Sequence, residues 1–211
     1  VLFAIDRAGL VGEDGPTHAG SFDISFLRCI PNLIIMTPSD ESETYRALST
    51  GYDFNGPAAV RYPRGKGIGI PIDKGMSPLE VGKGLIRRDG NTIAIFAFGS
   101  MVKAALEAAE KLGATLVDMR FVKPLDEELI SKLAANHQLV VTVEESAVMG
   151  GAGSAVNEFL TQTSTPIQTL NLGLPDKFLE HGKPSEMLDE INLNCEGIIQ
   201  AIKNKQNECG L

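Results

Sequence analysis

Short apolar runs alternate with amphipathic segments along almost the whole chain, and this alternation limits the folds that the chain can adopt. In the first third, we expect strands at 1–5, 33–36 and 58–62, and helices at 20–30 and 40–53. Asp40 and Glu43 have the spacing of a capping box at the start of the second helix. Strands that alternate with helices predict an α/β fold with a parallel sheet wrapped by helices.

A second α/β unit follows a stretch of different composition. Residues 65–82 are rich in glycine, contain two prolines and show little periodicity, which predicts a linker between domain 1–64 and domain 83–211. The turn sequence Asp89-Gly90-Asn91 predicts that strand 84–88 runs antiparallel to the rest of a mixed sheet. We expect the other elements to be strands 92–98, 114–119, 139–143 and 167–172, and helices 101–112, 126–135, 153–162 and 184–207.

Composition and charge exclude several classes of function. A net charge of −8 and a pI near 4.9 argue against nucleic-acid binding, which needs a basic surface. No apolar run approaches the roughly 20 residues of a membrane-spanning helix, and no export signal is visible, so we expect no membrane partner. Three widely spaced cysteines predict a reducing compartment.

The segment from Arg7 to Gly20 contains most of the recognisable chemistry. It follows the first predicted strand, and Arg64 follows another, so both arginines are expected at the carboxyl edge of the sheet, where ligands bind. Two guanidinium groups there predict a phosphate or carboxylate clamp. The alternative is that they pair with Asp6 or Glu13 on a solvated surface.

Asp14 and His18 lie in the same segment and are candidates for catalysis. An imidazole titrates near neutral pH, which suits acid–base chemistry, although a lone histidine is more often structural. Asp14 has a turn-forming role before Gly15 as its alternative. Arg61 lies inside a predicted strand, where we expect it to face solvent.

Two other features resemble binding sites, but the sequence favours a structural interpretation of both. The glycines of residues 150–154 precede a helix as in phosphate-binding loops, but the remaining residues of those motifs are absent, so we expect a tight turn. Glu144 and Glu145 have no metal-ligand companions, and a solvated strand end is expected there.

Several segments together resemble the transketolase-like, thiamine-diphosphate-dependent enzymes. The residues that carry the resemblance are Gly12–Gly20, which is similar to a motif of the pyrimidine-binding domain, and the flanking segments Phe3–Gly9, Phe26–Pro31, Val60–Gly65 and Asp118–Asp126. The resemblance implies the second half of a pyrimidine-binding domain followed by a transketolase C-terminal domain. In the family, the latter helps to build a homodimer and has no accepted catalytic role.

The resemblance also implies a reaction and a set of roles. The flanking segments are similar to the branch of the family that condenses pyruvate with glyceraldehyde 3-phosphate, with loss of CO2, for isoprenoid biosynthesis. By that similarity Arg7 and Arg64 hold the phosphate of glyceraldehyde 3-phosphate, Asp14 contacts a hydroxyl of this acceptor, and His18 acts on substrate hydroxyls and protons. The enzymes of the family use thiamine diphosphate and Mg2+.

The resemblance covers only part of such an enzyme. The family residues that bind thiamine diphosphate and Mg2+ correspond to positions upstream of Val1, so no cofactor-binding or metal-binding residue is assigned in this chain. Residues 1–5 read as a buried strand that lacks a preceding neighbour, so we expect a C-terminal part that needs the missing N-terminal part of the same chain and is inactive alone. The alternatives are the beta subunit of a 2-oxoacid dehydrogenase and a non-catalytic assembly module.

Overall fold

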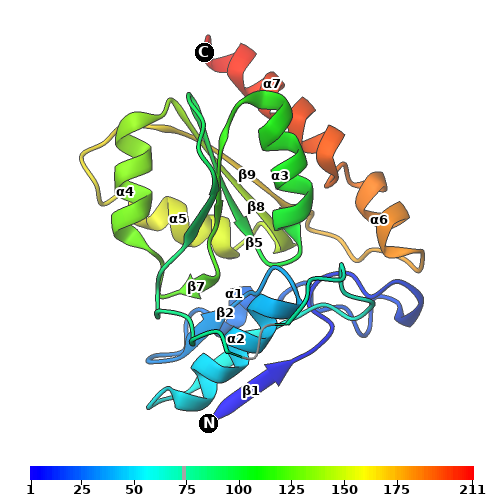
Figure 1. The fold of residues 1–211 in the computed structure, drawn as a ribbon. Helices are drawn as coiled ribbons and strands as arrows, with labels where there is room; N and C mark the ends of the chain where they lie inside the picture. The colour runs from blue at the N-terminus through cyan, green and yellow to red at the C-terminus, as the bar shows by residue number, and fades with distance from the viewer. Residues whose placement is uncertain (73–74) are drawn as a thin grey trace.

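The structure, a computed structural model, describes residues 1–72 and 75–211 and contains two β-sheets with helices around them. Figure 1 shows the first sheet near the N-terminus, and the larger second sheet between it and the C-terminus. Residues 73–74 of the predicted linker lie outside the described residues. No helix in the described part of the chain is long and apolar enough to cross a membrane.

The first sheet has the strand order β1-β3-β2-β7. Its first three strands, β1 (Leu2–Ile5), β3 (Ala58–Arg61) and β2 (Ile34–Met36), are parallel, as the sequence predicts. Two helices and one turn of 3₁₀ helix connect them: α1 (Asp23–Leu27), α2 (Glu41–Asp53) and η1 (Gly12–Asp14). In this chain β1 is an edge strand with a neighbour on one side only, and its Phe3 is 51% exposed.

The fourth strand of the first sheet comes from beyond the predicted linker. β7 (Phe121–Lys123) pairs antiparallel with β2, so the first sheet is mixed rather than wholly parallel. The sequence does not reveal this strand, because three residues are too few to show a periodicity. A segment of the second unit therefore forms the fourth strand of the first sheet.

The second sheet has the order β4-β6-β5-β8-β9. Its strands are β4 (Leu85–Arg88), β5 (Ile93–Phe98), β6 (Thr115–Asp118), β8 (Leu139–Ala147) and β9 (Gln168–Leu174). β4 is antiparallel, as predicted, but it pairs with β6 and not with β5, the next strand along the chain. The sheet is therefore mixed with an antiparallel first strand, which confirms the expected fold class.

Helices cover both faces of the second sheet. α4 (Glu127–Asn136) and α5 (Ala152–Leu160) lie on one side of it in Figure 1, and α3 (Met101–Leu112), α6 (Pro184–Glu190) and α7 (Cys195–Cys209) on the other. Asp40, Asp126 and Asn194 each accept a backbone hydrogen bond as helix caps. α3 ends at Gly113, which has a φ of +68°.

The apolar core does not divide between the two sheets. One cluster of buried side chains combines Ile24, Ile35 and Ala59 of the first unit with Phe96, Met119 and Val140 of the second. Another places Phe121 of β7 among residues of the first sheet and α2, such as Met36 and Val60. The two units therefore share a continuous apolar interior.

Candidate functional site

The segment from Arg7 to Gly20 forms a loop whose two ends are joined by backbone hydrogen bonds. We call this junction the neck of the loop. Gly20 donates a backbone hydrogen bond to the carbonyl of Arg7 (2.9 Å), and Gly9 donates one to the carbonyl of Gly20 (3.1 Å). Arg7 has a φ of +60°, a left-handed conformation that costs a non-glycine residue on the order of 1–3 kcal/mol and occurs often at functional sites. The loop thus leaves and re-enters the sheet at one point, and Arg7 lies at that point.

Three of the four predicted site residues meet at the carboxylate of Asp14. Arg7 Nε lies 3.1 Å from Asp14 Oδ2, and the Nη1 atom of Arg64 also pairs with Asp14 Oδ2. Arg7 additionally pairs with Asp6 through Nη1 at 2.7 Å, as the surface alternative predicts. The two arginine side chains are 36% and 51% exposed, so the cluster is open to solvent.

His18 belongs to the same loop and contacts the backbone of Asp14. Its Nδ1 lies 3.2 Å from the carbonyl oxygen of Asp14 and 3.0 Å from the hydroxyl of Thr17, and the residue is exposed. The structure therefore gathers Arg7, Asp14, His18 and Arg64 on one side of the first sheet. The arrangement combines two cations, a carboxylate and an imidazole, which is suited to binding a phosphorylated polar molecule.

Arg61 is buried, so the expectation that it faces solvent is wrong. It is 5% exposed, and its Nε lies 2.8 and 2.9 Å from the two carboxylate oxygens of Asp23. Its Nη2 donates to the carbonyls of Gly20 (2.5 Å) and Glu145 (2.8 Å). The sequence could not show this, because every partner of Arg61 lies in another element.

Glu145 connects the loop to the second unit. Its Oε1 accepts a hydrogen bond from the backbone of Leu10 (2.8 Å), and its Oε2 accepts one from the hydroxyl of Ser100 (2.6 Å). The residue is 7% exposed, and burial raises the pKa of its carboxyl. A solvated strand end, as the sequence suggests, is wrong for Glu145.

Glu144 is also buried, and it explains the glycine-rich turn that follows. It is 1% exposed, and its two carboxylate oxygens each accept a backbone N–H, from Ala152 and Gly153, at 2.7 Å. Burial raises its pKa to about 7, against the lowering effect of these hydrogen bonds. The amides that begin α5 therefore have an internal carboxylate as their partner, in agreement with the expected tight turn.

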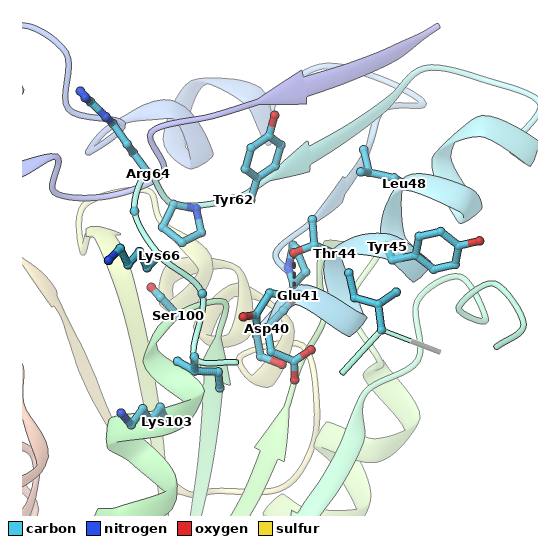
Figure 2. Close-up of a pocket in the computed structure, with 17 residues that line it drawn as sticks. Asp40, Glu41, Thr44, Tyr45, Leu48, Tyr62, Arg64, Lys66, Ser100 and Lys103 are labelled. Atoms are coloured by element: carbon cyan, nitrogen blue, oxygen red, sulfur yellow. Dashed lines mark hydrogen bonds between the residues drawn. The ribbon is translucent and has the colours of Figure 1, made fainter. Parts of the chain in front are cut away.

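A cavity of about 520 Å³ adjoins the loop cluster, and Arg64 is the predicted site residue that lines it. Its walls come from the start of α2, the start of α3 and the segment after β3. Figure 2 shows the guanidinium of Arg64 directed away from the carboxyl groups of Asp40 and Glu41. Asp14 does not line this mainly apolar cavity, so Arg64 is the residue that the cavity and the charged cluster have in common.

The loop also packs against a segment of the second unit that the sequence does not mark as part of the site. A methyl group added to Gly15 would lie 2.3 Å from His181 Nε2, and one on Gly12 would lie 2.9 Å from the carbonyl of Gly182. The imidazole of His181 therefore lies against the backbone of the loop. No sequence pattern could reveal this contact, because His181 is remote from the loop in the chain.

The described residues provide no clustered ligand set for Mg2+. No group of three or more His, Cys, Asp or Glu side chains suited to a metal ion occurs within residues 1–72 and 75–211. The helix start that most resembles a phosphate cradle, at α5, is already occupied by Glu144. We therefore derive no chemical step through this cofactor from the residues of this chain.

Comparison with protein families identifies two domains. The pyrimidine-binding domain of transketolase matches residues 1–68, and the C-terminal domain of transketolase matches residues 82–198. Among solved structures, a split-gene transketolase described as an inactive beta4 tetramer has a TM-score of 0.87 and 31% identity, over 98% of this chain and 67% of that one. A Campylobacter jejuni transketolase, with 20% identity and a TM-score of 0.73 over 96% of this chain and 31% of that one, shares the fold.

Curated relatives that are more similar to this chain than these solved structures share a single name. Proteins named 1-deoxy-D-xylulose-5-phosphate synthase from Pseudomonas aeruginosa and Pseudomonas syringae are 61% and 62% identical to this chain over 97% of its length. A Pseudomonas fluorescens protein of the same name is 58% identical over the whole chain. This chain spans about a third of the length of each of these relatives.

Proposed function

The chain belongs to the transketolase family, and from this premise we propose that it is the C-terminal part of a 1-deoxy-D-xylulose-5-phosphate synthase. In this proposal the whole enzyme condenses pyruvate with glyceraldehyde 3-phosphate, with loss of CO2, using thiamine diphosphate and Mg2+. This chain supplies the side of the active site that binds the phosphate of the acceptor. The cofactor is held by residues outside this chain.

The observation that carries the proposal is the convergence of Arg7 and Arg64 on Asp14. The two arginines follow the adjacent parallel strands β1 and β3 of the first sheet, and both reach the same carboxylate oxygen. A guanidinium has five N–H donors, so each arginine can bind phosphate oxygens while it keeps a bond to Asp14. We further propose that Asp14 contacts a hydroxyl of the acceptor and that His18 acts on its hydroxyls and protons.

Two other functions remain less well supported. The beta subunit of a 2-oxoacid dehydrogenase has the same order of domains, but its substrate has no phosphate that would require Arg7 and Arg64. A non-catalytic assembly module would require neither arginine. The names of the relatives favour the synthase over both alternatives.

The oligomeric state, the cellular location and the domain boundaries that we propose follow from the same premise. We propose a homodimer in the bacterial cytoplasm, since the relatives are proteins of Pseudomonas, with the plastid stroma as the alternative. We also propose the boundaries 1–64, 65–82 and 83–211 for the first domain, the linker and the second domain. Sedimentation of the whole enzyme measures its oligomeric state directly.

The acceptor clamp is tested in a chimera in which this chain replaces the matching third of the Pseudomonas aeruginosa relative. Arg7→Ala or Arg64→Ala should raise the KM for glyceraldehyde 3-phosphate by about tenfold or more, because a charge-assisted hydrogen bond contributes about 1.5–3 kcal/mol. The KM for pyruvate should change by less than about twofold. Steady-state kinetics with each substrate varied in turn provides both values.

Lys66→Ala is the matched control for this experiment. Lys66 is an exposed cation that lines the neighbouring cavity but has no part in the proposed clamp, so both KM values should stay unchanged. Equal increases in both KM values for the arginine variants would contradict the proposal. Turnover by the isolated chain, supplied with both substrates, thiamine diphosphate and Mg2+, would contradict the expectation that it is inactive alone.

A further inference from the structure

The end of β8 contacts the loop formed by Arg7–Gly20 on both sides of its neck. At the entrance, Glu145 accepts the backbone N–H of Leu10. At the exit, the carbonyl of Ser21 accepts two hydrogen bonds, from the backbone of Ala147 (2.7 Å) and from the hydroxyl of Ser146 (3.0 Å). Three consecutive residues of the second unit therefore hold the loop of the first.

The burial of Glu145 indicates a specific role. A buried carboxyl group is costly unless its oxygens have good partners, and both oxygens of Glu145 have short hydrogen bonds. Gly9 lies directly against it, because a methyl group added to Gly9 would lie 2.4 Å from Glu145 Oε1. The carboxyl thus fills a space that is shaped by the backbone at the loop entrance.

The contacts of the neck extend from Glu145 to Arg7. Arg7 and Gly20 are joined by a backbone hydrogen bond, and Arg61 Nη2 donates to the carbonyls of both Gly20 and Glu145. A shift of the loop relative to β8 would therefore move the backbone of Arg7, whose side chain bonds to Asp14. This chain of contacts links a residue of the second sheet to the acceptor clamp.

We propose that Glu145 is a positioning residue for the acceptor site: by holding Leu10 at the neck of the loop, it sets the place of Arg7 relative to Arg64. The inference rests on the proposed function, since it assigns to the second domain a part in binding the acceptor phosphate. Glu145 acts through the backbone and does not touch the substrate.

The kinetic test uses the chimera with the Pseudomonas aeruginosa relative. Glu145→Ala should raise the KM for glyceraldehyde 3-phosphate by about tenfold while the KM for pyruvate changes by less than about twofold, because a displaced binding group weakens only its own substrate. Glu145→Gln keeps an oxygen for Leu10 and an amide that can donate to Ser100, so it should restore the KM to within about threefold of the unsubstituted chimera.

Glu144→Gln is the matched control. It changes the neighbouring buried carboxyl, whose hydrogen bonds go to the amides of α5 and not to the loop, so both KM values should be preserved. A Glu145→Ala variant that loses only kcat, or raises both KM values equally, would overturn the positioning role. So would a Glu145→Gln variant as defective as Glu145→Ala.

A second measurement does not depend on activity. In the 211-residue chain, hydrogen–deuterium exchange of peptides within 8–21 should become at least about tenfold faster for Glu145→Ala, and should stay unchanged for Glu144→Gln. If Glu145→Ala fails to fold, Ser146→Ala removes one bond to Ser21 and should speed exchange in the same peptides. Unchanged exchange in the variant that folds would overturn the inference. If the variants change the exchange but the unsubstituted chimera is inactive, only the proposed function is overturned.

Discussion

Glu144 and Glu145 are consecutive residues of β8, and both are buried, but they serve different parts of the molecule. Successive side chains of a strand point to opposite faces of the sheet, so the two carboxyls meet different partners. Glu144 holds the start of α5 within its own unit, and Glu145 holds the loop of the other unit. In the sequence, Glu144 and Glu145 resemble an exposed acidic pair, but in the structure each makes a separate structural contact.

Glu144 should make the stability of the chain depend on pH. Its pKa of about 7 in the folded state exceeds the ordinary value of 4.5, so the folded chain holds a proton that the unfolded chain releases. The free energy of unfolding should therefore fall as pH rises from about 4.5 to about 7, by up to about 3 kcal/mol from this group. Urea unfolding of the chain at a series of pH values measures the slope.

Substitution isolates this contribution from those of other groups. Glu144→Gln should make the slope in this pH range shallower, whereas Glu107→Gln, at an exposed position on α3, should leave it unchanged. An equally steep slope in the Glu144→Gln variant would assign the effect to another residue.

At the scale of single residues, the sequence predicts which side chains form the site, but not which buried side chains hold them in place. Arg7 and Arg64 could be placed together because the carboxyl ends of parallel strands share an edge. Arg61 could not be placed, since its burial depends on Asp23 and Glu145, which are distant in the chain. His181 was missed for the same reason.

At the scale of elements, single polar side chains fix the ends of several helices and strands. Asp126 accepts a hydrogen bond from the backbone of Leu129 (3.1 Å) as the cap of α4, and another from the backbone of Gly84 (3.0 Å), just before β4. One carboxylate therefore fixes the start of a helix and the start of the antiparallel edge strand. Asp40 caps α2 in the same manner, but Glu43 does not complete the capping box, because its carboxylate pairs with Arg46 and Arg120.

Asp126→Ala should destabilise the chain by about 2 kcal/mol or more. The substitution removes a helix cap, which contributes about 1 kcal/mol, and leaves the amide of Gly84 without its partner. Glu128→Ala is the control, because Glu128 lies on the same helix and its side chain is 87% exposed. The urea midpoint of both variants should be compared with that of the original chain, and equal midpoints for all three would contradict the role of Asp126.

The sequence predicts most elements well, because their length and periodicity are local properties. It does not predict the neighbours of a strand. β4 follows the antiparallel direction that its turn indicates, yet its partner is β6, and β7 is too short to be recognised. Strand order depends on contacts between remote segments, which single-sequence patterns do not contain.

At the scale of the whole molecule, the two sheets form one structural unit. β7 completes the first sheet, Phe121 packs in the core of the first sheet, and a second core cluster contains residues of both sheets. Polar contacts join the sheets as well: Arg120 pairs with Glu43, and Asp118, which accepts a hydrogen bond from Arg87 of its own sheet, accepts another from Ser39 of the first unit. Burial raises the pKa of Asp118, against the lowering effect of these partners.

The chain should therefore unfold in a single cooperative transition. Differential scanning calorimetry should give one endotherm whose calorimetric and van't Hoff enthalpies agree. Phe121→Ala should destabilise the whole chain by about 3–5 kcal/mol, because it leaves a cavity where a residue from beyond the linker packs in the core of the first sheet. Two separate endotherms, of which only one responds to Phe121→Ala, would show that the sheets unfold independently.

The position of β7 in the chain has a consequence for synthesis on the ribosome. β1, β2 and β3 are made before β7, so β2 remains without its outer neighbour until Phe121–Lys123 have been translated. At about 5–20 residues per second, this delay is on the order of seconds. Nascent chains arrested before β7 should therefore remain sensitive to protease in their first sheet, and longer arrested chains should become resistant once β7 has left the exit tunnel.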